Sequence, residues 1–417
     1  SVAREFLAGL PVAPRLPRVE EPNAVERILA DPGLVRQSVD VGSLVSHLRS
    51  SNSEVQQLVI ARLAELCASR ELSCAQGNTD INAQILVQVR QTQPRVWLEL
   101  LRALAPVHPR RALRLAMALL TTRECTPNHR IIAGEFIVQD AGKSMKDLFH
   151  LVEHNAGDAV AALTMNIACY RFEEALGFCK RQLTSTSSSG RLEATRFVGL
   201  LGKYTWDSPP HPQLEIRRRG CAEVLVPLLR DSDARVRKMA LTALFEQQWP
   251  QVGEEAGRMI EDLHCEVRKL SVEVLGETGG SPAFHRILDR QQDSDEGVRK
   301  TALEMAIRLA PGQKTEIALS FLSDQSAKVA GRAAALLESS ADPWVLEKCL
   351  EKLTTASAES GRIILELIKK INPDRLVEAI ELVWHRGKSG AMLGLIRFLD
   401  AHGDSNEIEI LTSLLEA

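Results

Sequence analysis

The chain has 417 residues, of which 45% are hydrophobic and 25% charged, proportions that exclude wholesale disorder and a fibrous protein. Lys and Arg number 51 against 54 Asp and Glu, so the net charge of −3 supplies no overall field that would gather nucleic acid or anionic lipid. Aromatic residues make up only 4%, so the core must be built mainly from Leu, Ala, Val and Ile, which favours helices.

The eight cysteines are scattered without a CxxC pair, and we interpret them as reduced, mostly core thiols. The longest apolar run, residues 159–170, is too short to cross a bilayer, so we expect no membrane insertion and a cytoplasmic location. The chain begins Ser-Val-Ala without a signal-type apolar stretch, and a processed or excised fragment stays open.

Residues 1–33 include the Pro-rich stretch PVAPRLPRVEEP and predict an N-terminal arm or linker. Residues 34–183 predict degenerate helical repeats, with a buried anchor at Val55 and again at Val96. Weaker anchors follow near Ile131 and Val160. A polar loop at 69–80 accounts for the longer step between the first two anchors.

The sequence His150-LVE-His154 places two imidazoles on one helix face beside Glu153, a spacing found in inverted zinc metallopeptidases. Glu173 or Glu174 could be imagined as a further ligand. The motif falls at the end of a first helix, however, where a thin layer offers little pocket or second shell. We therefore interpret the histidines as solvated helix-end residues and predict no metal and no cofactor.

Residues 184–213 combine the serine-rich TSTSSSG with the proline-rich WDSPPHP and predict an interruption of the array around one poorly matched helix pair. Residues 214–417 then carry the regular repeats. Segments starting at Asp231, Asp262, Asp293 and Asp324 superimpose without gaps, at a spacing of 31 residues. Each reads as a helix, a tight turn at the Asp and a second helix.

Each second helix carries an anchoring valine, a small residue four positions later and apolar residues seven and eight positions later, the pattern of a buried helical stripe. The anchors are Val236, Val267, Val298 and Val329. Two further steps of 31 land at Ser360 and Ala391, so about ten helical hairpins fit the chain.

The Asp turn, the Val-Arg-Lys at the head of the second helix and the small residue four positions on resemble HEAT repeats, nearest to the short phycobilisome-lyase HEAT-like kind. The resemblance implies an all-α, right-handed α-solenoid whose second helices line the concave face. Relatives of this kind are mostly scaffolds, adaptors and regulatory subunits that bind other proteins. A few are enzymes, namely bilin lyases and alkylpurine DNA glycosylases.

The repeat aligns a set of basic residues along one edge of the stack, with acidic turn residues beside them. We interpret this set as a structural ladder between neighbouring repeats rather than a phosphate-binding stripe. The predicted ladder consists of Asp231, Asp262, Asp293 and Asp324 with Arg237, Arg268 and Arg299.

Two and six positions after each anchor, side chains should point outward and face a partner. Trp97 stands one position after its anchor, where the regular repeats carry Arg, and an exposed tryptophan there would anchor a partner; packing into the next repeat is the alternative. The candidate protein-binding residues are Trp97, Lys238, Lys269, Glu273, Lys300 and Glu304.

We expect a non-enzymatic scaffold, adaptor or regulatory subunit that binds another protein, rather than nucleic acid, on its concave face. An enzyme resembling a bilin lyase or an alkylpurine DNA glycosylase is the alternative, and a zinc metallopeptidase at His150, Glu153 and His154 comes third. The sequence predicts neither the partner's identity nor an oligomeric state.

Overall fold

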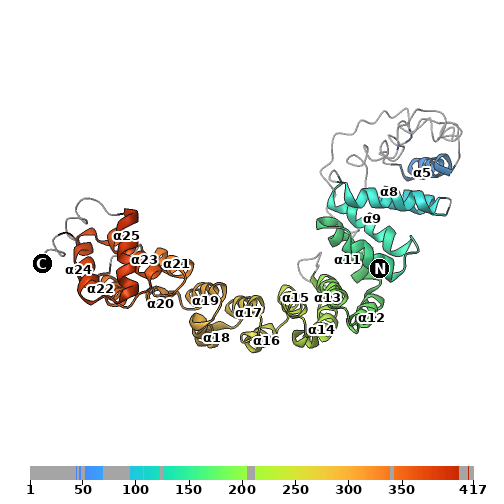
Figure 1. Ribbon diagram of the computed structural model, residues 1–417. Helices are drawn as coiled ribbons and strands as arrows, with labels where there is room; N and C mark the ends of the chain where they lie inside the picture. Colours follow the sequence, from blue (N-terminus) through green and yellow to red (C-terminus); the bar gives the residue numbers. More distant parts are fainter. Residues whose placement is uncertain are drawn as a thin grey trace. The chain divides into compact units, whose positions relative to one another are not determined.

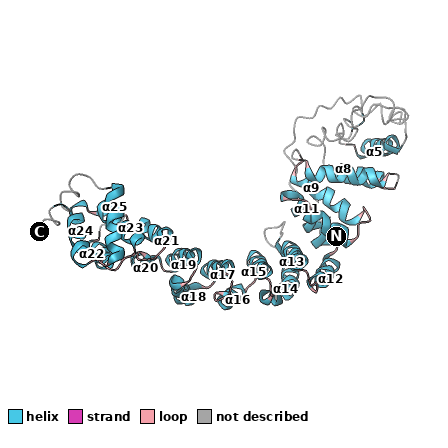
Figure 2. Ribbon diagram, in the orientation of Figure 1, coloured by secondary structure: helices cyan, strands magenta, loops and turns pink. Residues whose placement is uncertain are grey.

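The structure is a computed structural model that describes residues 44, 47, 52–68, 94–106, 108–122, 125–203, 212–338, 342–402 and 412. Within these residues the chain forms α-helices, short 3-10 helices and turns, and no strand (Figure 2). The predicted arm at 1–33 and the polar loop at 69–80 lie wholly outside the described residues. Across the described part, no helix has the length and apolarity needed to cross a bilayer.

The chain divides into two units, Ser1–Leu228 and Leu229–Ala417. In unit 1, alternate helices contact one another in a row (Figure 1). This row consists of α5 (Ser53–Ala68), α7 (Pro94–Leu104), α9 (Pro127–Gln139), α11 (Gly157–Tyr170) and α13 (Ser188–Lys203). The helices that flank it are α8 (Pro109–Thr121), α10 (Met145–Glu153), α12 (Phe172–Leu183) and α14 (Pro212–Leu225).

Unit 2 repeats this arrangement with greater regularity, and each flanking helix packs on the row helix that follows it (Figure 1). We call the row the second helices: α15 (Ala234–Glu246), α17 (Cys265–Thr278), α19 (Glu296–Leu309), α21 (Ala327–Leu337), α23 (Ala358–Ile371) and α25 (Ser389–His402). The first helices are α16 (Val252–Met259), α18 (Gly280–Leu288), α20 (Lys314–Phe321), α22 (Pro343–Leu353) and α24 (Leu376–Arg386).

Short 3-10 helices tighten several of the connections. They are η3 (Val226–Arg230), η4 (Asp289–Gln292), η5 (Pro311–Gln313) and η6 (Pro373–Arg375). Two of them, η5 and η6, begin with proline, whose fixed φ and missing N–H suit the first position of a helix.

The core follows the anchors predicted from the sequence. Every anchor lies in a row helix and is at most 5% exposed, as the stripe pattern requires: Val55, Val96, Ile131, Val160, Val236, Val267, Val298, Val329, Ser360 and Ala391. The small residues four positions after the regular anchors, such as Ala240 and Ala302, are fully buried as well. The predicted all-α fold of stacked helical hairpins is confirmed, while its handedness and the number of hairpins stay predictions.

The Asp that marks each repeat does not itself cap the second helix that follows the turn. The helix is capped instead by the residue two positions later, for example Asp233 before α15 and Asp295 before α19. The Asp folds the turn: Asp231 accepts from the backbone N–H of Asp233 at 2.8 Å, and Asp293 accepts from that of Asp295 at 2.9 Å. One carboxylate oxygen thereby shapes the turn while the group still faces the neighbouring repeat.

The stretch predicted as an interruption contains an ordinary row helix. Residues 184–187 form a turn, and α13 follows directly, packed on α11 and α12. Residues 204–211 lie outside the described part of the chain. The domain boundary predicted near residue 213 stays a prediction.

Candidate functional site

The predicted ladder forms as a series of bidentate ion pairs between neighbouring second helices of unit 2. Arg237 Nε and Nη2 donate to Asp262 at 2.7 and 2.6 Å, and Arg268 donates to Asp293 at 2.8 and 2.7 Å. Arg299 donates to Asp324 at 2.7 and 2.9 Å. Each pair joins one helix to the turn before the next, so the planar fork of arginine fixes the register of adjacent repeats.

The remaining guanidinium nitrogen, Nη1, also donates hydrogen bonds in each of these arginines. Arg268 Nη1 donates to the carbonyl oxygens of Asp262 and Leu263 at 3.0 and 3.2 Å, in the turn before its own helix. Arg299 does the same with Asp293 and Ser294 at 2.8 and 3.2 Å. The side chains are well covered, most of all in the last pair, where Arg299 is 5% and Asp324 6% exposed.

The pKa values of the ladder follow from this geometry. Burial alone would raise the pKa of Asp262 and Asp293, but the hydrogen bonds from arginine and from a backbone N–H outweigh it and hold both below their usual value. The hydrogen bonds to Asp raise the pKa of Arg237, Arg268 and Arg299 above the usual value. Both partners of these pairs therefore carry full charge at neutral pH, and each arginine is hydrogen-bonded to its aspartate.

The outward side chains of the second helices divide into paired and unpaired members. Lys238 bonds to Glu266 on the next second helix at 2.7 Å, and Glu304 bonds to Arg332 at 3.3 Å. Among the described residues, Lys269, Glu273 and Lys300 form no hydrogen bond or ion pair, although each is partly or fully exposed.

The spacing of Lys and Glu within α17 and α19 does not produce ion pairs here. Glu273 and Glu304 stand four residues after Lys269 and Lys300, the spacing of an intrahelical pair. Neither pair forms among the described residues: Glu304 bonds instead to Arg332 of the following helix, and Lys269 and Glu273 stay apart. Lys269 is partly covered and Lys300 is exposed, and neither ammonium group has a hydrogen-bond partner among the described residues.

Further along the row, the outward charges give way to a groove of about 240 Å³ between α21 and α23. Gly331 stands where the earlier repeats carry lysine, so no side chain fills the space above it. The walls are charged: Lys370 meets Glu338 across the groove at 2.5 Å, and Arg362 pairs with Glu366 within α23. The groove thus offers opposite charges around a small apolar floor.

Trp97 lies elsewhere than the binding hypothesis requires. Its side chain is fully buried in α7, so it cannot contact a partner, and the alternative of packing inside the array is correct. Its indole Nε1 finds no hydrogen-bond acceptor among the described residues. The exposed tryptophan of the described chain is Trp344, 41% exposed in the first turn of α22.

Sequence reasoning also passed over several exposed apolar side chains. Leu263 is 98% exposed in the turn before α17, where the other regular repeats carry Ser232, Ser294 or Gln325. Only that departure from the repeat could have singled it out. Scattered exposed apolar residues are ordinary on protein surfaces, and Leu263 alone defines no site.

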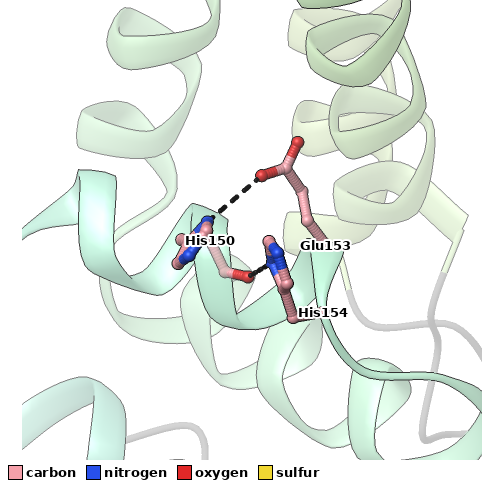
Figure 3. A group of neighbouring side chains, drawn as sticks. All are labelled: His150, Glu153 and His154. Atoms are coloured by element: carbon pink, nitrogen blue, oxygen red, sulfur yellow. Dashed lines mark hydrogen bonds and ion pairs between the residues drawn. The ribbon is translucent and has the colours of Figure 1, made fainter.

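The histidine motif falls at the end of a first helix, as the repeat alignment predicts. Helix α10 ends at Glu153, and His154 occupies the capping position after it. The side chains of His150, Glu153 and His154 gather on one side of the helix end, with their ligand atoms within 4.8 Å of one another (Figure 3). The two imidazole rings lie 3.9 Å apart between centroids, and His150 Nδ1 is 3.6 Å from a Glu153 oxygen.

Glu153 has a second acidic neighbour, Glu193 on α13. Burial raises the pKa of Glu153 above its usual value, and the adjacent Glu193 raises it further because two neighbouring carboxylates resist ionising together. The other candidate ligands are not recruited: Glu174 is paired with Arg171 at 2.6 Å, and the described cluster includes neither Glu173 nor Glu174.

A cleft of about 440 Å³ lies beside the cluster, lined by Glu153 and His154 and by residues from α8, α9 and α11. On its far wall Arg130 pairs with Asp158 at 3.1 Å. The cluster therefore faces a polar, open space rather than the core.

The search of family models found no match, and neither did the search of curated proteins. Among solved structures, the chain is similar to YibA of Escherichia coli, with 14% identity and a TM-score of 0.38 over 61% of this chain and 92% of that one. It is also similar to a structure titled "Structure of the Pds5-Scc1 complex and implications for cohesin function", with 12% identity and a TM-score of 0.41 over 93% of this chain and 73% of that one. Similarities this low carry no information on function, so the fold rests on the helix order and ion pairs of the chain itself.

Proposed function

We propose that the chain is a non-enzymatic scaffold or adaptor that binds a protein partner along the second helices of unit 2, on the concave face of the array. The observation that carries the proposal is the division of charge on this row. The ladder arginines are saturated by carboxylates and carbonyls, whereas Lys269, Glu273 and Lys300 are left without partners among the described residues. A mixed-charge surface of this kind complements the polar rim of a protein interface.

The groove between α21 and α23 supports the same surface. It follows the unpaired charges along the row, and its floor at Gly331 has room for a partner side chain. A small apolar floor between charged walls suits a projecting side chain of a partner.

The ladder also favours a protein over nucleic acid. A phosphate-binding stripe needs arginine or lysine donors that have no other acceptor. The donors of Arg237, Arg268 and Arg299 are already hydrogen-bonded to Asp and to backbone carbonyls. The remaining free lysines alternate with acidic residues such as Glu273, which repel phosphate.

The test is affinity purification of the full chain from its native host, followed by mass spectrometry, for wild type and a Lys269→Glu, Lys300→Glu variant. The variant reverses the two free positive charges without touching the ladder, and we expect it to lose a protein that wild type recovers. A matched control, Lys314→Glu with Lys352→Glu, makes the same charge change on the first helices α20 and α22. The control should recover that protein as wild type does.

Equal recovery by both double variants would contradict the assigned face. Turnover of a small molecule by the purified chain, with no protein recovered, would contradict the scaffold itself. Tight duplex-DNA binding with a steep salt dependence would assign the surface to nucleic acid instead.

A further inference from the structure

The orientation of His154 is fixed in the way that metal-bound histidines are fixed. Its Nδ1 lies 2.9 Å from the carbonyl oxygen of His150. A carbonyl can only accept, so Nδ1 carries the hydrogen and the Nε2 of the neutral ring keeps its lone pair. A backbone carbonyl that selects the tautomer and holds the ring is the usual second-shell partner of a histidine ligand.

His150 is placed to share a ligand with that ring. The two histidines are four residues apart on the last turn of α10, and Glu153 stands between them on the same side of the helix (Figure 3). Ligand atoms in a tetrahedral zinc site with bonds of 2.0–2.1 Å stand about 3.3 Å apart. The three present groups lie within 4.8 Å, and the exposed His150 side chain, 68% accessible, is free to rotate the remaining distance.

The surroundings favour a cation. Glu193 on α13 places a second carboxyl group beside Glu153, so two acidic groups meet at the edge of the cluster. The nearest arginine of the adjoining cleft, Arg130, is already paired with Asp158.

The site is also accessible. The cleft of about 440 Å³ beside Glu153 and His154 leaves room for an ion to enter and for water to complete its coordination. The thin layer of the array, which argued against a metal site at the level of sequence, thus provides both an oriented imidazole and an open cleft.

We propose that His150, Glu153 and His154 bind a divalent transition-metal ion of the zinc class, with water in the remaining positions. Two imidazoles and one carboxylate suit zinc, cobalt or nickel, whereas calcium and magnesium take oxygen ligands only. The ion joins the last turn of α10 to its capping residue, ahead of the turn that leads into α11. The site lies in unit 1 and is independent of the protein-binding surface proposed for unit 2.

The experiment is equilibrium dialysis of the metal-free full chain against buffered ZnCl₂, with X-ray absorption at the zinc edge. We expect one site that His150→Ala with His154→Ala weakens by at least about 100-fold, the upper end of the losses caused by second-shell changes alone. Glu153→Gln should weaken it by about tenfold or more. The absorption spectrum should show nitrogen and oxygen neighbours with imidazole scattering, and no sulfur.

The matched control is His285→Ala, which removes an exposed histidine from the last turn of α18 that has no histidine four residues away. Its zinc affinity should equal that of wild type. Equal affinity in wild type and the double histidine variant would overturn the proposal. Sulfur in the zinc shell would overturn it too, because it would place the ion on a cysteine. An unchanged affinity in Glu153→Gln would overturn the three-ligand assignment, and circular dichroism checks that each variant folds.

Discussion

In unit 2, the second helices from α15 to α21 are joined by the same bidentate Arg–Asp pair at a constant spacing, whereas in unit 1 the polar contacts along the row differ from one another. There, Asn166 on α11 donates to the carbonyl of Ile131 on α9 at 3.0 Å, in a fully buried contact. Arg102 on α7 bonds to Glu135 at 3.2 Å and to Asp140 at 2.9 Å. Both units stack helices on buried anchors, so the periodic ladder is one way of fixing register and not a requirement of the fold.

The difference between the units follows from how regular their repeats are in sequence. From α15 to α21, Arg and Asp recur at the same positions of each repeat, and one geometry serves these three interfaces. In the degenerate repeats of unit 1, close packing helps to fix the register of neighbouring helices. Gly134 leaves space for Asn166, since a Cβ at this glycine would lie 2.8 Å from Asn166 Nδ2 and 3.0 Å from the carbonyl oxygen of Ala162.

The largest effect is expected from breaking the most buried ladder pair. Arg299→Met removes the partner of Asp324 and leaves a covered carboxylate, which should lower the free energy of unfolding of unit 2 by about 3–5 kcal/mol. Denaturant titration of the full chain measures the change. Arg235→Met is the matched control, because Arg235 also forms an ion pair with an aspartate but is exposed; it should have little effect. Equal losses in the two variants would show that burial of the ladder is not what matters.

A smaller loss is expected where unit 1 relies on close packing. Gly134→Ala should destabilise it by about 1–3 kcal/mol, because the added methyl group forces Asn166 away from its two carbonyl acceptors. Gly177→Ala on α12 is the control, since its Cβ meets only the end of the Arg181 side chain at 3.8 Å. That variant should be neutral or stabilising by up to about 1 kcal/mol, as expected for glycine in a helix. Stabilisation by both substitutions would contradict the packing account.

Acid should weaken unit 2 through the ladder. The pKa values of Asp262 and Asp293 are lowered by folding, so their contribution is fully present above the usual Asp pKa of 3.8 and is lost as the pH falls through the lower folded value. Asp293→Asn removes this dependence at one pair. The difference in unfolding free energy between wild type and the variant should therefore shrink as the pH falls below about 4. A difference that stays constant down to pH 2 would contradict the ionic account of the ladder.

The smallest effect is expected at the outer edge of the same repeats. Lys328 and Glu296 form an ion pair at 2.5 Å, but Lys328 is 77% exposed, and solvent screens the pair. Lys328→Ala should leave the denaturation midpoint unchanged within error at physiological salt. A loss comparable with that of Arg299→Met would mean that exposed and covered pairs contribute alike.

Much of unit 2 could be predicted from the sequence, because one period fixes anchors, turns and ladder together. The anchoring Val267 and the pair between Arg268 and Asp293 lie where the repeat indicates. Trp97 shows where such reasoning stops. In a degenerate repeat the position after the anchor no longer has a fixed environment, so an exposed position in one hairpin is the core in another.

The histidine cluster shows the same limit. Its spacing and its place at a helix end follow from the sequence, but the carbonyl that orients His154 and the approach of Glu193 do not. The approach of Glu193 depends on how α13 packs against α10, which no local sequence pattern encodes. The groove at Gly331 likewise depends on the neighbouring helix α23.

A double-mutant cycle on Arg268 and Asp293 tests most directly whether the ladder couples adjacent repeats. The variants are Arg268→Met, Asp293→Leu and their combination, compared with the exposed pair Lys328 and Glu296 treated in the same way. A coupling free energy of about 1–3 kcal/mol is predicted for the buried pair, with none measurable for the exposed one. A coupling within error of zero at Arg268 and Asp293 would contradict the account, because the ladder would then be a consequence of the stack and not a cause of its register.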